Sequence, residues 1–195
     1  MLMSFFDGTS LIPLDFSLHK EKSLPLKKRR KQYHKKRAES SAGDKRQKEL
    51  TSKKNDSAIA MLKRAVKHGV HAKYVLFDSW FFSKKLVDEV LRIGNKKGVY
   101  MDIAGGVKTS IRFNWNGQLL NSGKLRESVK KNAKRCKKWK NSRYFEFIVQ
   151  YKGVDMKLFI CRYPNQKKWR SFVTTNRDLT FLEFMKLYGI RWSIE

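Results

Sequence analysis

The chain has 195 residues, and its 45 lysines and arginines against 17 aspartates and glutamates give a formal net charge of +28. Hydrophobic residues make up 41% and aromatic residues 13%, a composition that excludes a purely disordered basic tail and predicts a folded core. No stretch approaches the roughly 18 uncharged apolar residues of a membrane span, no basic signal segment opens the chain, and two cysteines without a CxxC pair exclude a disulfide framework or a Cys-rich zinc site.

The positive charge is concentrated in two blocks. Residues 20–54 hold 15 basic and 4 acidic residues, and residues 124–143 hold 10 basic and 1 acidic residue. Phosphate contacts made by such blocks release counterions, so nucleic acid is the partner that the charge favours. A solvated loop without a ligand is the alternative for the first block. A membrane surface is weaker for both, because neither block has a clean apolar face.

The N-terminal segment predicts a β-hairpin followed by a polar insertion. Residues 1–6 are apolar, Asp7 and Gly8 favour a turn, and residues 11–18 alternate in polarity. Residues 20–54 contain too few apolar side chains to form a core. The buried face of the second strand is expected to carry Ile12, Leu14, Phe16 and Leu18.

The next segment predicts an α/β core. A helix capped by Asp56 or Ser57 ends at Gly69, the strand Tyr74–Phe77 follows, and a second helix begins near residue 80. Residues 98–104 predict another strand, closed by Gly105 and Gly106. Helix, strand and helix in this order are typical of α/β proteins.

The C-terminal half predicts a β-rich insertion followed by a helix. Thr180 and Glu183 have the spacing of a capping box and open an amphipathic helix. The chain stops within this helix and starts within an apolar strand, so we expect a fragment of a longer protein. The expected strands of the insertion are 111–120, 145–151, 156–163 and 171–174.

Two carboxylates, those of Asp78 and Glu195, have positions compatible with a catalytic or metal-binding role. Asp78 directly follows an apolar strand, where α/β folds place ligands and metals, although an N-cap of the following helix would also explain it. Glu195 shares one helix face with Tyr188 and Arg191, which by spacing alone also fits an Arg–Glu helix pair.

Taken together, these motifs resemble the insertion-sequence-4 type of DDE transposases. The resemblance rests on the run Phe77–Phe81, on Thr174–Asn176 and on Tyr188, Arg191 and Glu195 in the spacing Y-x2-R-x3-E, which is the family's signature for the helix of the catalytic acid. The run Phe6–His19 is similar to the family segment between the first two catalytic acids. The resemblance covers nearly the whole chain in the expected order.

The resemblance implies an α/β, RNase H-like fold interrupted by a β-rich insertion. Residues 1–104 would be a partial core with a basic loop at 20–54, residues 105–174 the insertion, and residues 175–195 the start of the catalytic-acid helix. It also implies cutting and joining of DNA phosphodiesters with two Mg²⁺ ions, for which Mn²⁺ can substitute. The implied partner is double-stranded DNA, namely transposon ends and target, which the full-length family binds as a dimer. The implied location is the cytoplasm of a prokaryote, in association with the nucleoid and without a membrane partner.

The resemblance also assigns residues. Asp78 and Glu195 would be the second and third catalytic acids and metal ligands, while Tyr188 and Arg191 would bind phosphate near the cut. Trp169 could stack on an unpaired base, although packing on the sheet explains it as well. The basic residues beside it, also expected to bind DNA, are Lys167, Lys168 and Arg170.

The family's first acid has no counterpart here, because it lies on a core strand that this chain is expected to lack. Since positional errors of about 1 Å can cost on the order of 100-fold in rate, we expect the chain alone not to cut DNA. A non-enzymatic nucleic-acid-binding module remains the alternative. A complete nuclease that uses Asp15 as the first acid is less favoured.

Overall fold

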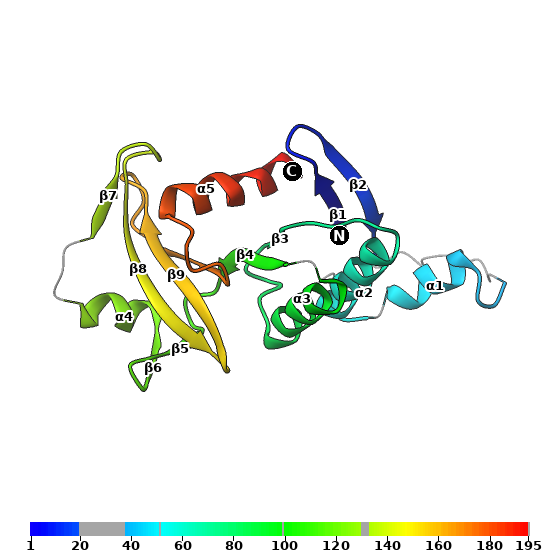
Figure 1. Cartoon of the computed structure of the whole chain (residues 1–195), viewed down its shortest axis with the longest axis horizontal. Coiled ribbons are helices and arrows are strands. Elements are labelled where there is room, and N and C mark those ends of the chain that lie inside the picture. Colours follow the sequence, from blue (N-terminus) through cyan, green and yellow to red (C-terminus); the bar gives the residue numbers. More distant parts are fainter. Residues whose placement is uncertain (20–37, 51, 99, 130–132, 195) are drawn as a thin grey trace, which may run out of the picture. The chain divides into compact units, whose positions relative to one another are not determined.

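The computed structural model describes residues 1–19, 38–50, 52–98, 100–129 and 133–194. These residues form two compact units, Met1–Val70 and His71–Glu195 (Figure 1). The chain is mixed α/β, as the sequence predicts. No described helix is long and apolar enough to span a membrane. The expected division at residues 104 and 105 falls within a strand of the second unit and remains a prediction.

The first unit is a hairpin with two helices. Its strands pair antiparallel around the turn at Asp7, whose Oδ1 accepts hydrogen bonds from the amides of Thr9 and Ser10 at 2.8 and 2.7 Å. The second helix ends at Lys67 with His68 as its C-cap, and Gly69 follows in the C′ position with a φ of +85°, as predicted. Its predicted cap is wrong, because the helix starts before Asp56. The elements are β1 (Leu2–Phe6), β2 (Leu11–Phe16), α1 (Ala42–Glu49) and α2 (Lys54–Lys67).

The predicted buried face of β2 is also wrong. Ile12, Phe16 and Leu18 are exposed. The largely buried side chain on this strand is Asp15, which forms ion pairs with Arg46 at 2.6 Å and with Arg64 at 2.8 Å. Ion pairs with arginines of two helices therefore bury Asp15, which lies on the face of β2 that the local polarity pattern assigned to solvent.

Replacing Asp15 with asparagine is expected to destabilise the first unit by about 2 kcal/mol at pH 7, since a charged partner is lost by both arginines. Burial raises the pKa of Asp15, but the hydrogen bonds from Arg46 and Arg64 outweigh it and hold the pKa below its ordinary value of 3.8. The stabilisation is therefore present above pH 3.8 and lost as the pH falls through the lowered pKa.

Hydrogen exchange of the α2 amides measures this effect, and the difference between wild type and Asp15→Asn should shrink between pH 7 and pH 3. The exposed Glu39 supplies the control Glu39→Gln, which should change stability by less than about 0.5 kcal/mol. All five tryptophans lie beyond residue 70, so tryptophan fluorescence of the second unit should not change. Equal effects of the two substitutions would contradict the assignment.

The second unit is built on one mixed sheet, in the order β3-β4-β10-β9-β8-β5-β6, with β7 paired to β8. The pair β3–β4 is parallel and the other pairs are antiparallel. The strands are β3 (Tyr74–Phe77), β4 (Asp102–Val107), β5 (Arg112–Trp115), β6 (Gln118–Asn121), β7 (Lys134–Cys136), β8 (Ser142–Tyr151), β9 (Val154–Arg162) and β10 (Arg170–Thr174). The helices are α3 (Lys84–Lys97), α4 (Ser122–Ser128), α5 (Phe181–Gly189) and the 3-10 helix η2 (Ile190–Ile194).

Two details of this sheet differ from the predictions. The segment expected as one strand, 111–120, is a hairpin, because Asn116 and Gly117 both have positive φ, at 51° and 82°. Gly105 and Gly106 lie inside β4 and do not close it. The other predicted strands of the insertion are confirmed.

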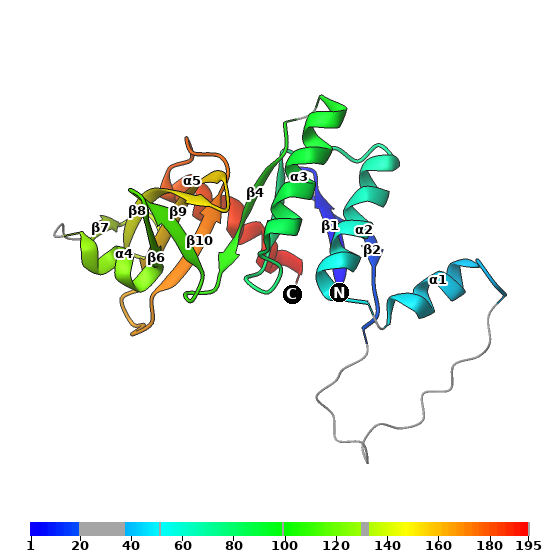
Figure 2. The same cartoon turned by 90° about the horizontal axis from the view of Figure 1, so that it is seen from below.

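Helices cover both faces of the parallel pair. Figures 1 and 2 show α3 along one face of β4 and α5 along the other. The capping box that starts α5 is confirmed, with Glu183 N donating to Thr180 Oγ1 at 3.3 Å and Thr180 N donating to Glu183 Oε2 at 2.8 Å. The helix therefore begins at a fixed point and carries its aromatic face over β9 and β10.

Candidate functional site

Asp78 lies in the turn directly after β3. Its carbonyl accepts a hydrogen bond from Phe81 N at 2.9 Å, and its Oδ1 accepts one from Ser79 N. The N-cap of α3 is Ser83, whose Oγ accepts from Leu86 N at 3.3 Å. The N-cap explanation of Asp78 is therefore wrong. The carboxylate closes its own turn, and the side chain is 42% exposed.

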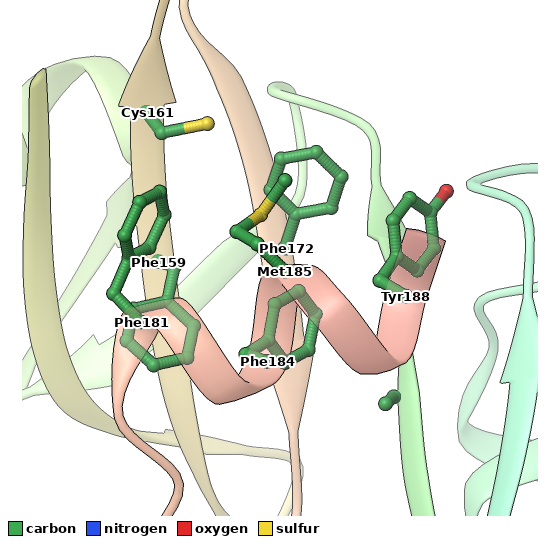
Figure 3. Close-up of a cluster of buried hydrophobic side chains, with 8 residues drawn as sticks. Phe159, Cys161, Phe172, Phe181, Phe184, Met185 and Tyr188 are labelled. Carbon is green, nitrogen blue, oxygen red and sulfur yellow. The ribbon is translucent and has the colours of Figure 1, made fainter. Parts of the chain in front are cut away.

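Tyr188 is positioned by an aromatic row on α5. The ring stacks on Phe184 at 5.9 Å and meets Phe172 edge-on at 5.0 Å. Figure 3 shows this row facing β9 and β10, with Tyr188 at its C-terminal end. The buried cluster comprises Ala104, Phe159, Cys161, Phe172, Phe181, Phe184, Met185 and Tyr188.

Gly106 makes room for the Tyr188 hydroxyl. A Cβ at this position would lie 3.2 Å from Tyr188 Oη and 3.2 Å from Ser79 N, closer than most real Cβ contacts. The hydroxyl therefore reaches the turn that carries Asp78. Burial raises the pKa of Tyr188, Arg191 lowers it and Asp78 raises it further, with a net upward shift. Tyr188 is thus a neutral hydrogen-bond donor at physiological pH.

Arg191 completes this group of side chains. Its Nη1 lies 3.9 Å from Asp78 Oδ2, and the guanidinium carbon lies 5.3 Å from the Tyr188 ring centroid and 4.4 Å from that of Trp192. The side chain is only 13% exposed. A guanidinium held by two aromatic rings keeps its charge beside the Asp78 carboxylate, and the long ion pair can exchange with an incoming phosphate.

The structure therefore brings Asp78, Tyr188 and Arg191 together at the carboxyl end of β3. Glu195, the other predicted acid, lies outside the described residues. It follows directly after η2, which ends at Ile194.

The tryptophan predicted to bind DNA is packed against the sheet. The Trp169 ring lies 5.6 Å from Phe145, and the guanidinium carbons of Arg126 and Arg162 lie 5.1 and 5.0 Å from its centroid. These contacts favour the packing explanation, and a stacking role for Trp169 remains a prediction. Lys167, Lys168 and Arg170 beside it are exposed.

Arg170 connects this basic segment to the site. Ser171 pairs with Val107, so the start of β10 lies beside the carboxyl end of β4. Arg170 contributes to lowering the pKa of Tyr188. The register thus places Arg170 at the same sheet edge as Asp78.

The sequence assigned no role to two residues at this edge, Lys108 and Trp80, although Trp80 lies in the run Phe77–Phe81 that carries the resemblance. Lys108 follows β4 and its Nζ lies 4.1 Å above the Trp80 ring centroid. Trp80 is followed by two phenylalanines, so the local pattern indicates only an apolar run. The approach of Lys108 depends on the parallel pairing of β3 with β4.

The donor set fits a hard cation in part. Asp78 offers a solvent-accessible carboxylate oxygen, the ligand type that Mg²⁺ prefers. Within the described residues no group of three or more His, Cys, Asp or Glu side chains could hold a metal ion. A complete site would need Glu195 and at least one further carboxylate.

A buried carboxylate, that of Asp102, lies at the opposite end of β4. Asp102 accepts a hydrogen bond from Thr175 Oγ1 at 2.6 Å, and Thr175 Oγ1 accepts one from Ile103 N at 3.1 Å. Burial raises the pKa of Asp102 despite this bond. The residues from Thr174 to Asn176, which contributed to the family resemblance, thus join β10 to the start of β4.

Comparison with known proteins supplies no family. No protein-family model matches the chain, and the search of curated proteins finds no significant match. The motifs and the geometry at the end of β3 therefore carry the functional interpretation.

Proposed function

We propose that this chain is part of a DDE transposase of the insertion-sequence-4 type, with an RNase H-like core and a β-rich insertion, and that it acts on double-stranded DNA. The observation that carries the proposal is the approach of Arg191 to Asp78, 113 residues apart in sequence, at the carboxyl end of a parallel strand. The resemblance had matched these two residues separately, one on each side of the insertion.

The charge distribution supports a nucleic-acid substrate. Arg191 lies beside Asp78, Arg170 acts electrostatically on Tyr188, and the whole chain carries a formal net charge of +28. A phosphate at this edge would be bound by the guanidinium of Arg191 and by the neutral hydroxyl of Tyr188. Arg191 would then offset the negative charge that develops in the transition state.

Asp78 and Glu195 would be the metal ligands. Bound Mg²⁺ supplies the Lewis acid that activates a water or 3′-hydroxyl and stabilises the leaving oxygen. The turn hydrogen bonds at Asp78 orient its carboxylate, and Tyr188 and Trp192 hold Arg191 in place. The resemblance matches no residue of this chain to the first catalytic acid, so we propose that the chain binds DNA but does not cut it alone.

Replacing Asp78 with asparagine tests this proposal in a DNA nicking and strand-transfer assay with Mg²⁺ or Mn²⁺. The assay compares the chain with a version extended at both ends by the flanking coding sequence. We expect cleavage only by the extended version, and a loss of at least about a hundredfold in Asp78→Asn because the metal position is disturbed.

The matched control is Asp88→Asn, which removes an exposed α3 carboxylate that pairs with Lys84. It should retain cleavage. Strong cleavage by the unextended chain that Asp78→Asn abolishes would contradict the proposed inactivity, and cleavage that survives Asp78→Asn would contradict the site.

A non-enzymatic nucleic-acid-binding protein is the second candidate, favoured by the two basic blocks alone. It requires neither Asp78 nor Arg191. Salt-sensitive DNA binding without cleavage by either version of the chain would favour it.

A further inference from the structure

Trp80 exposes a large aromatic ring to solvent, although burial of such a ring would be favourable. Its side chain is 72% exposed, whereas Phe82, two residues later, is buried. Phe82 packs against Tyr151 at 4.8 Å and against Phe77 at 6.3 Å. The turn is therefore anchored on both sides of Trp80, and its exposure is a fixed feature of the fold.

The backbone holds Trp80 beside the carboxylate of the proposed active site. The hydrogen bond from Phe81 N to the Asp78 carbonyl makes residues 78–81 a turn, with Trp80 at its third position. Asp78 Oδ1 tightens the same turn through Ser79 N. A ligand that binds the Trp80 ring would therefore lie beside the turn that carries Asp78.

Lys108 places its positive charge over the Trp80 ring. Its Nζ lies 4.1 Å from the ring centroid, a distance typical of a cation–π contact. Lys108 is exposed, and β3 and β4 run parallel, so Trp80 and Lys108 follow adjacent strand ends. The ammonium covers part of one face, and most of the ring remains open to solvent.

The surrounding charges favour an anionic, aromatic ligand. Trp192 is exposed beside Arg191, which also contacts Asp78. An indole stacks on any nucleobase, and a lysine next to it can contact the phosphate, which is the combination used by single-strand-binding surfaces. A cationic protein partner would be repelled by these basic side chains.

We propose that Trp80 and Lys108 form a stacking platform for an unpaired base of the DNA strand that passes Asp78. Trp80 stacks on the base and Lys108 contacts its phosphate. This inference rests on the proposed function, to which it adds the form of the substrate, a DNA end with unpaired nucleotides.

Fluorescence anisotropy with labelled DNA tests the platform without any cleavage step. The probes are a blunt duplex and the same duplex with a short unpaired end, both in EDTA. Stacking energies of about 1–3 kcal/mol per base predict that Trp80→Ala loses about 5- to 150-fold in affinity for the unpaired end and little for the blunt duplex. Lys108→Gln should lower the salt dependence by about one phosphate contact for the unpaired end.

Tyr100→Ala is the matched control, because Tyr100 is 76% exposed and precedes β4, at the opposite end of the strand. It should bind both probes like wild type, and thermal unfolding should show that all three variants are folded. The platform is overturned if Trp80→Ala weakens both probes equally, weakens neither, or matches Tyr100→Ala. Because binding is measured without metal, a failure of Asp78-dependent cleavage leaves this result intact, and the reverse also holds.

Discussion

Replacing Phe184 with alanine is expected to destabilise the second unit by about 3–5 kcal/mol, the largest effect we predict. Phe184 is fully buried and contacts the rings of Phe159 at 5.2 Å and Phe172 at 5.8 Å. Removing it opens a cavity between α5 and the sheet. A loss of this size is a large part of the stability of a typical domain.

The same substitution should disturb the candidate site. The Tyr188 ring stacks on Phe184 with an interplanar angle of 10°, and Tyr188 in turn supports Arg191. We therefore expect Phe184→Ala to weaken DNA binding even at temperatures where the unit remains folded. Phe184→Leu, which leaves a smaller cavity, should have an intermediate effect on both.

Urea unfolding followed by tryptophan fluorescence measures this prediction, since every tryptophan lies in the second unit. Leu119→Ala is the control, because Leu119 is an exposed residue of β6 in the same sheet. It should change the free energy of unfolding by less than about 0.5 kcal/mol. A loss below about 1.5 kcal/mol in Phe184→Ala would show that α5 is not anchored by this ring.

The features that the sequence predicted correctly are those determined by neighbours along the chain. The α5 capping box depends on Thr180 and Glu183, three residues apart, and the end of α2 depends on the positive φ of Gly69. The hairpin at Asn116 and Gly117 was missed, although this dipeptide is itself a strong local turn signal.

A different kind of error arises where a residue distant in sequence determines the structure. The polarity pattern placed Asp15 on the solvent face of β2. Hydrogen bonds from Arg46 and Arg64, 31 and 49 residues away, instead bury most of its side chain. The proximity of Asp78 and Arg191 could be expected only from the family resemblance, because 113 residues separate them. Lys108 could not be matched to Trp80 without knowing that β3 and β4 are parallel.

Gly105 is a further position where a tertiary contact determines which residue fits, and Gly105→Ala is expected to destabilise the second unit by about 3 kcal/mol. A Cβ there would lie within 2.7 Å of three carbon atoms of the Phe77 ring. Phe77 is buried against Phe82, so its ring cannot move without displacing other core side chains. Since Asp78 follows Phe77 directly, the clash should also shift the turn of the candidate site.

A double-mutant cycle separates this clash from a general effect of alanine in a strand. Phe77→Leu removes the outer ring atoms and should make Gly105→Ala less harmful, with a coupling free energy of about 1–3 kcal/mol. The control is Gly123→Ala in α4, where the nearest atom to a new Cβ is Asn121 Oδ1 at 3.4 Å. Alanine there should be neutral or stabilise by up to about 1 kcal/mol, because alanine has a higher helix propensity than glycine. Additive effects of Gly105→Ala and Phe77→Leu would mean that the glycine does not serve to seat the Phe77 ring, and the close packing of β3 on β4 would need another cause.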